Sequence, residues 1–460
     1  MRILFLCFIA TALLGITSNI KAQSESEIEA LRSELAQMRS DYEARIEQLE
    51  KRLDAAEKKA AGQEEVIAQQ AKQPVTQSAA TQAPQVISPV TAGVVPSSNP
   101  DLGVVFQGQA WSYKNDPDDY YIPGFPLGGE AGPLPEGFAL GEIEINISAN
   151  VDDKFTAWLT APLVVEDGEA GIEIEEAWIE TLTMPAGLSL RMGRFFSNIG
   201  YLNEKHSHSW DFADQPLAYQ VFLGGQYGDD GMRLNWVAPT DIYFELGAEA
   251  LRGDRYPAGG ASNSGPGSYT LRTRLGGDVG FSNSWQAGLS YLQADADARA
   301  SGDEDDLLLF SGDSDLVIAD FVWKWAPNGN VRQRNLKLQA EYLWRNETGL
   351  YTLTDGRVLP YDNDQSGWYL QAVFQPFPMW RFGVRYDQLS SDDPGEAFRG
   401  TMLMPADRTP RRYGIMADWS NSEFSRLRLQ YTYDKAGVED DNQWGLQYIF
   451  SIGAHGAHSF

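Results

Sequence analysis

The sequence predicts an all-β, antiparallel transmembrane β-barrel of about sixteen strands, preceded by an α-helical coiled coil. Two observations predict the barrel. Residues 101–460 hold stretches of about 8 to 13 residues in which polar and apolar side chains alternate, and the segments between them are alternately short and long. A closed barrel lets such a chain cross a bilayer, because the backbone groups of each strand pair with those of its neighbours.

Residues 1–22 are predicted to be a signal peptide. Arg2 supplies a positive charge, residues 3–16 are apolar, and cleavage is expected after Ala22. The single cysteine, Cys7, lies within this segment. The mature chain is therefore predicted to contain neither a disulfide nor a thiol nucleophile.

The charge and the motifs of the chain exclude several classes of protein. The formal net charge is −28 at pH 7, which argues against a nucleic-acid partner, because such partners are bound through lysine and arginine. No run of 18 apolar residues follows the signal peptide, so no transmembrane helix is available, and the chain is either a large soluble β protein or a closed membrane barrel. Without a Gly-x-Ser-x-Gly motif or a nucleophile beside its four histidines, the chain is predicted not to be an enzyme and to have no catalytic residue.

Residues 23–70 are predicted to form a periplasmic coiled coil. The segment is rich in Glu, Ala and Leu, and apolar residues recur every three or four positions, as at Ile28, Leu31, Leu35 and Met38. A three-stranded coil is our preferred interpretation, and a lone helix packed on the barrel is the alternative. Residues 71–100 contain five prolines and almost no charge, so they are predicted to be a flexible linker.

Residues 101–460 are predicted to be the barrel. The alternation is clearest near the end of the chain, where Trp444, Leu446 and Tyr448 alternate with glutamine and glycine. Short turns are predicted at 151–154, 184–187, 239–241, 282–284, 327–333, 376–378 and 421–423, and long loops at 114–137, 196–230, 252–268, 296–313, 347–365 and 390–408. Short turns at one end and long loops at the other are typical of outer-membrane barrels.

A barrel of this width is predicted to enclose an aqueous channel, because its side chains cannot fill it. The same alternation places charged residues on the inner face, where they avoid lipid. The predicted basic wall comprises Arg191, Arg233, Arg272, Arg274, Lys324, Lys337, Arg345, Arg381, Arg385, Arg412, Arg426 and Arg428. Glu142, Glu144, Glu173 and Glu175 are predicted to face inward as well.

The long loop at 196–230 is the predicted constriction. It carries Asp211 and Asp214, and acids on an inserted loop opposite a basic wall would set a transverse field across the narrowest point. The alternative is that these acids solvate an external loop. The same loop holds His206 and His208, which with Asp211 and Asp214 nearby are a candidate site for Zn²⁺ or another transition metal; hydrogen bonding within the loop is the alternative. No other cofactor is predicted.

The run Gly-Arg-Phe-Phe-Ser-Asn-Ile-Gly at 193–200, which leaves a strand for a long loop, resembles the phosphate-selective porin superfamily. The order of signal peptide, short coil and sixteen-stranded barrel is similar to that group too. The resemblance implies a trimeric diffusion channel with a substrate bias. Acidic loops at 116–119 and 303–306 depart from a mouth that attracts anions.

These observations predict an outer-membrane porin of a Gram-negative bacterium that lets small hydrophilic solutes or ions diffuse passively. The alternatives are a TonB-dependent-type receptor for zinc or a nutrient, and a structural tether that acts through the coiled coil. The predicted partners are outer-membrane lipid and lipopolysaccharide, two further copies of the chain, and peptidoglycan or a periplasmic protein at the coil.

Overall fold

The computed structural model describes residues 99–166, 169–260, 265–302 and 307–453. The predicted signal peptide, the predicted coiled coil and nearly all of the predicted linker lie outside the described residues. No helix within the described ranges has the length and apolar character needed to cross a membrane.

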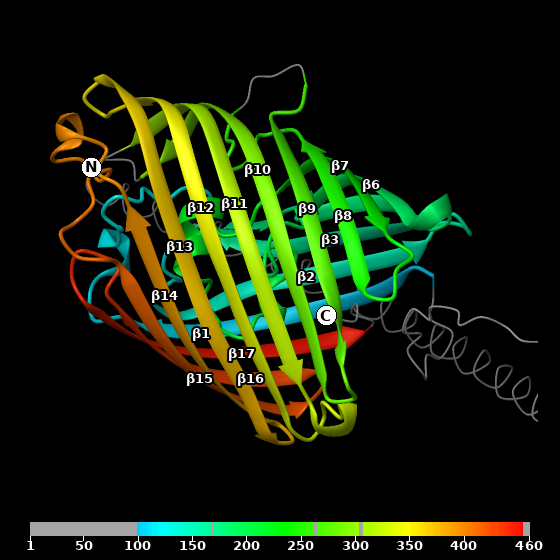
Figure 1. Ribbon diagram of the computed structural model, residues 1–460. Helices are drawn as coiled ribbons and strands as arrows, with labels where there is room; N and C mark the ends of the chain where they lie inside the picture. Colours follow the sequence, from blue (N-terminus) through cyan, green and yellow to red (C-terminus); the bar gives the residue numbers. More distant parts are fainter. Residues whose placement is uncertain (1–98, 167–168, 261–264, 303–306, 454–460) are drawn as a thin grey trace, which may run out of the picture. The chain divides into compact units, whose positions relative to one another are not determined.

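The described residues form a single closed antiparallel sheet (Figure 1). Its strands are β1 (Asp101–Ser112), β2 (Gly137–Asn150), β3 (Phe155–Glu166), β4 (Glu169–Ile172), β5 (Glu176–Thr181), β6 (Leu188–Phe196), β7 (Gly228–Val237), β8 (Tyr243–Leu251), β9 (Ser268–Val279), β10 (Asn283–Ser301), β11 (Leu308–Trp325), β12 (Asn335–Thr352), β13 (Val358–Phe377), β14 (Trp380–Ser391), β15 (Arg411–Ser422), β16 (Ser425–Asp434) and β17 (Asp441–Gly453). Short helices interrupt the connections: α2 (Leu217–Leu223) and the 3₁₀ turns η1 (Pro117–Asp119), η2 (Pro185–Gly187), η3 (Ser207–Ser209), η4 (Pro327–Gly329) and η5 (Glu396–Phe398).

The seventeen segments make sixteen barrel strands, because β4 and β5 follow one another along the same partner, β3. Between them, the amides of Glu173 and Glu175 still donate to the carbonyls of Pro162 and Thr160, at 3.0 Å each. The barrel closes where β1 pairs with both β2 and β17, so that Val104 lies between Ile145 and Ile452. The predicted sixteen-stranded antiparallel barrel is confirmed.

The side chains of the last strand show which face meets lipid. Trp444, Leu446 and Tyr448 are about half exposed on the outer face, whereas Gln443 and Gln447 are buried on the inner face. An outer apolar face is what a membrane barrel requires, since exposed charges there would cost free energy. The predicted alternation is therefore confirmed in this strand.

Each predicted short turn coincides with or adjoins a turn between two strands, but two of the predicted long loops are largely strand. In the 296–313 region β10 runs to Ser301 and β11 begins at Leu308, and in the 347–365 region β12 and β13 extend in the same way. In Figure 1 these strands rise well beyond their neighbours. Here an apolar cluster around Phe310, Tyr351 and Tyr361 lies on the inner face, beside the buried ion pair of Arg299 and Glu347, and most of the outer residues are polar. Because polar residues occupy most outer positions here, the sequence pattern predicted loops in place of these strand extensions.

The connection from β6 to β7, residues 197–227, is called the third loop below. It carries α2, whose residues are all buried. Apolar residues of the third loop, among them Ile199, Leu217 and Phe222, pack in one cluster with inner side chains of the wall such as Leu316 and Leu343. The inner face of this part of the wall is therefore apolar, because α2 requires an apolar surface to pack on.

Candidate constriction site

The third loop is held inside the barrel by hydrogen bonds to strands far away in the sequence. The amide of Gly200 donates to Ser290 Oγ on β10 at 3.1 Å, and the amide of Tyr201 donates to Glu341 Oε2 on β12 at 2.9 Å. Gly200 has a φ of +62°, and a β-carbon at this position would lie 2.5 Å from Glu341 Oε2. Glycine therefore allows the loop to turn against the wall.

The second half of the third loop contacts strands further round the barrel, β14 and β16. The amide of Ala213 donates to Gln430 Oε1 on β16 at 2.8 Å, and the amide of Leu217 donates to Asp387 Oδ1 on β14 at 3.0 Å. The loop therefore spans the interior between β10 and β16. Its predicted place inside the barrel, rather than outside, is what the structure shows.

Two cavities lie on opposite sides of one segment of this loop. A cavity of about 920 Å³ is bordered by the short turns around Phe281 and Gly329, and a cavity of about 410 Å³ is bordered by the 113–136 connection. His206, His208 and Asp211 line the larger cavity, whereas Ser207 and Trp210 line the smaller one. Residues 206–211 therefore form a partition between the two cavities.

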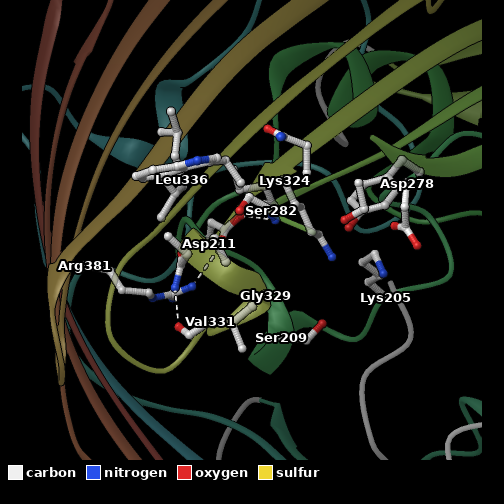
Figure 2. A pocket seen from close by; sticks show the side chains of 18 of the residues that line it. Lys205, Ser209, Asp211, Asp278, Ser282, Lys324, Gly329, Val331, Leu336 and Arg381 are labelled. Atoms are coloured by element: carbon white, nitrogen blue, oxygen red, sulfur yellow. Dashed lines mark hydrogen bonds and ion pairs between the residues drawn. The ribbon is translucent and has the colours of Figure 1, made fainter. Parts of the chain in front are cut away.

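The two cavities have opposite charge. Among the described residues that line the larger cavity, the bases are Lys205, Lys324, Lys337, Arg381 and Arg426, and the acids are Glu204, Asp211 and Asp278. Figure 2 shows Asp211 and Arg381 in contact at one side of this cavity, with Lys205 and Lys324 at the other. Among the described residues that line the smaller cavity, the acids are Glu130, Glu142, Glu173, Glu175 and Asp214, and the base is Arg255.

Asp211 and Asp214 bind the basic wall directly. Asp211 forms ion pairs with Lys337 and, at 3.0 Å, with Arg381. Asp214 pairs with Arg385 at 2.7 Å and with Arg412 at 3.3 Å. The predicted opposition of loop acids and wall bases thus exists at these two positions, as close ion pairs.

The other predicted basic residues also have partners, many of them on the wall itself. Arg191 pairs with Glu180, Arg233 with Glu249, Arg274 with Glu204 and Arg428 with Asp418. Arg272 donates to the carbonyl of Gly200, Arg345 to Tyr256 and Gln365, and Arg426 to the carbonyls of His208 and Trp210. Sequence reasoning did not single out the wall acids Glu249, Asp387, Asp418 and Asp434. The three aspartates each share a strand face with an arginine, and Glu249 lies directly across from Arg233 on the neighbouring strand.

The two histidines of the third loop face glutamates on β2 and near the start of β5. Asp211 and Asp214, in contrast, form ion pairs with basic residues. His206 Nδ1 lies 3.1 Å from Glu175 Oε2, and His206 Nε2 lies 3.0 Å from Glu176 Oε2. His208 Nδ1 lies 2.8 Å from Glu144 Oε1. The two rings stack, with centroids 5.8 Å apart.

Two further glutamates complete this part of the site. Glu142 Oε2 accepts a hydrogen bond from Ser207 Oγ at 2.9 Å. Glu173 is exposed and borders the smaller cavity. Glu176, which sequence reasoning missed, is brought to His206 by the break between β4 and β5.

Burial and neighbouring charge act against each other on the loop side chains. Burial favours the neutral form of Asp211, but the charges of Lys337 and Arg381 outweigh it and hold the pKa of Asp211 below its usual range. Burial likewise favours neutral His206, but Glu175, Glu176 and Glu144 outweigh it and raise the pKa of His206 well above its usual value. Burial lowers the pKa of Lys205 to about 8, against the opposing charge of Glu204.

These features define the class of protein: a sixteen-stranded transmembrane-type β-barrel with its third loop folded inside, which is the fold of outer-membrane porins. The crystal structure of the outer membrane channel DcaP of Acinetobacter baumannii is similar to this chain with a TM-score of 0.51 and 14% identity, over 79% of this chain and 100% of that chain. OmpT of Vibrio cholerae in its trimer form gives a TM-score of 0.48 at 10% identity, over 77% of this chain and 100% of that chain. No model of a known protein family matches the sequence.

In sequence, the chain belongs to the same family as an uncharacterized protein of Aquifex aeolicus (strain VF5). The two are 31% identical over 353 residues, which cover 72% of this chain and 72% of that protein.

Proposed function

We propose that this protein is an outer-membrane porin, through which small hydrophilic solutes or ions diffuse passively. The observation that carries the proposal is a closed barrel with an apolar outer face and two cavities inside, on either side of the third loop. Charged side chains from the wall and from the loop line both cavities. A hydrated interior explains their presence, because charges facing lipid would be costly.

The third loop makes this channel narrow and selective. Apolar packing around α2 fills one side of the interior, so solutes must pass the partition at residues 206–211. There they meet imidazoles and carboxylates on one side and the ion pairs of Asp211 and Asp214 on the other. A narrow, strongly charged passage sorts solutes by charge and dipole rather than by size alone.

The same proposal includes the porin family, the oligomeric state, the position of the coiled coil and the lipid neighbours of the barrel. The 193–200 run supports a relation to the phosphate-selective porins, and it leads from β6 into the third loop. The predicted coiled coil supports a homotrimer whose coil lies in the periplasm, and the apolar outer face supports lipid and lipopolysaccharide as neighbours.

Planar-bilayer recording of the purified protein tests this function. We expect discrete conductance steps, grouped in threes for a trimer. Correctly folded protein that gives no conductance would contradict the porin proposal, and steps that always occur singly would contradict the trimer. The β-barrel itself is checked beforehand by a heat-dependent change in gel mobility.

A further inference from the structure

We propose that Glu144, Glu175 and His206 form a binding site for a divalent transition metal ion of the Zn²⁺ type, at the partition between the two cavities. The proposal goes beyond the channel function and does not depend on it. It differs from the histidine pair considered in the sequence, because it draws one imidazole and two carboxylates from three separate segments: β2, the break between β4 and β5, and the third loop.

The spacing of the three donors fits a metal ion. One ligand atom from each residue lies within 4.8 Å of the other two. His206 Nδ1 is 3.1 Å from Glu175 Oε2 and 3.7 Å from Glu144 Oε2. A tetrahedral zinc ion with bonds of about 2.0–2.1 Å holds its ligand atoms about 3.3–3.4 Å apart, so the observed distances lie on either side of the required value.

A buried carboxylate oxygen of Glu144 is available to bind an ion at this place. The Glu144 side chain is fully buried, and its Oε2 makes no hydrogen bond to any described residue. An unsatisfied buried carboxylate oxygen costs free energy. A metal ion bonded to this atom would remove that cost.

The residues around the three donors would orient them for a metal. With Nδ1 on the ion, His206 Nε2–H would donate to Glu176 Oε2 at 3.0 Å, an arrangement found around most metal-bound histidines. Glu176 is itself fixed, because it accepts a hydrogen bond from the amide of Phe196. Glu144 Oε1 is held by His208 at 2.8 Å.

The donor chemistry indicates which metal would bind. An imidazole with carboxylates suits Zn²⁺ and its transition-metal neighbours, whereas Ca²⁺ and Mg²⁺ favour sets of oxygen donors alone. Glu176 adds negative charge beside the three donors. Three protein donors leave one tetrahedral position for water or for a solute in the cavity.

Calorimetric titration of the full-length protein in detergent with ZnCl₂ tests the site. The background variant carries His455→Ala and His458→Ala, so that these two histidines add no binding. We expect one zinc ion per chain, a loss of affinity of about 100-fold or more in His206→Ala and in Glu144→Gln, and a loss of about 10-fold in Glu176→Gln. Glu396→Gln, a change at an exposed carboxylate of the 392–410 connection, is the matched control and should bind zinc normally.

X-ray absorption at the zinc edge supplies the second readout. One imidazole and oxygen ligands are expected. Absence of saturable binding at about 0.1 mM zinc, normal binding by His206→Ala, or a spectrum with two imidazoles would each overturn the proposal. Because none of these measurements needs an ionic current, a barrel that binds zinc without conducting would contradict the porin proposal alone.

Discussion

At the scale of single residues, the inward arginines are mostly bound to the protein itself. Arg428 is fully buried between Asp418, Gln447 and the carbonyl of Trp210. Breaking such a buried pair is costly, because the remaining charge loses its partner. These arginines therefore fix the third loop and the wall, and the solute meets chiefly the side chains that border the two cavities.

Asp211 gives a prediction about stability and pH. Asp211→Asn removes the carboxylate that Lys337 and Arg381 share, and should lower the stability of the folded barrel by about 1–3 kcal/mol at neutral pH. Since folding depresses the pKa of Asp211, its contribution is complete above about pH 4, the usual value for an unfolded aspartate, and fades as the pH falls further.

Urea titration in lipid or detergent micelles, followed by tryptophan fluorescence at several pH values, measures this difference. An Asp211→Asn variant that equals the parent protein at pH 7, or a difference that grows below pH 4, would contradict the assignment. Asp355→Asn, at an exposed pair with Arg357 in the 353–357 turn, is the control and should change little.

The sequence predicts single residues well where the strand period decides their place. Trp444 and Gln443 face opposite sides because neighbours in a strand must do so. It does not predict that His206 meets Glu175 and Glu176, because that contact depends on the path of the third loop and on the break between β4 and β5. Asp387, two positions from Arg385 on the same face, is an ion partner that the period could have identified.

At the scale of elements, the third loop depends on its contacts with β10 and β12. Gly200→Ala would strain the left-handed backbone there and place a β-carbon against Glu341 and Tyr219. We expect a loss of stability of about 2 kcal/mol or more and a higher, noisier single-channel conductance, as the loop leaves the wall.

The control variant Gly356→Ala separates the effect of backbone strain from the effect of a β-carbon placed against Glu341 and Tyr219. Gly356 also has a positive φ, of +84°, but a β-carbon there meets nothing within 4 Å. This control should show the backbone strain without any change in conductance. Equal effects of the two substitutions on conductance would contradict the proposed packing of the third loop on β10 and β12.

The boundaries of the third loop were nearly predictable, but the residues of the wall that it contacts were not. The sequence places the loop at 196–230 and the structure at 197–227, because Asp229 and Asp230 already belong to β7. The partners of Gly200 and Leu217, Ser290 and Asp387, lie 90 and 170 residues away. No local pattern specifies contacts over such separations.

At the scale of the whole barrel, charge changes sign along the passage. The cavity toward the long loops is acidic and the cavity toward the short turns is basic. When the long-loop side is positive, cations enter from that side and meet the acidic cavity first, and anions enter from the short-turn side and meet the basic cavity first. Each kind of ion is therefore drawn into a cavity of opposite charge and enters easily. We therefore expect larger currents at that polarity, and an asymmetry that weakens as salt rises.

The double variant Glu130→Gln, Glu173→Gln tests the predicted current asymmetry, because it removes two of the acids of the smaller cavity. The current–voltage curve should become more symmetric at low salt. Asp118→Asn, in the exposed η1 turn, is the control. An unchanged asymmetry in the double variant would contradict the role given to the acidic cavity.

Single-channel recording in planar bilayers, with a salt gradient across the membrane, is the most direct test of a narrow, charged diffusion channel. We predict discrete conductance steps that are larger when the long-loop side is positive, and a reversal potential away from zero that reports the charge at the partition. Correctly folded barrels that insert into the bilayer and pass no current would contradict the account.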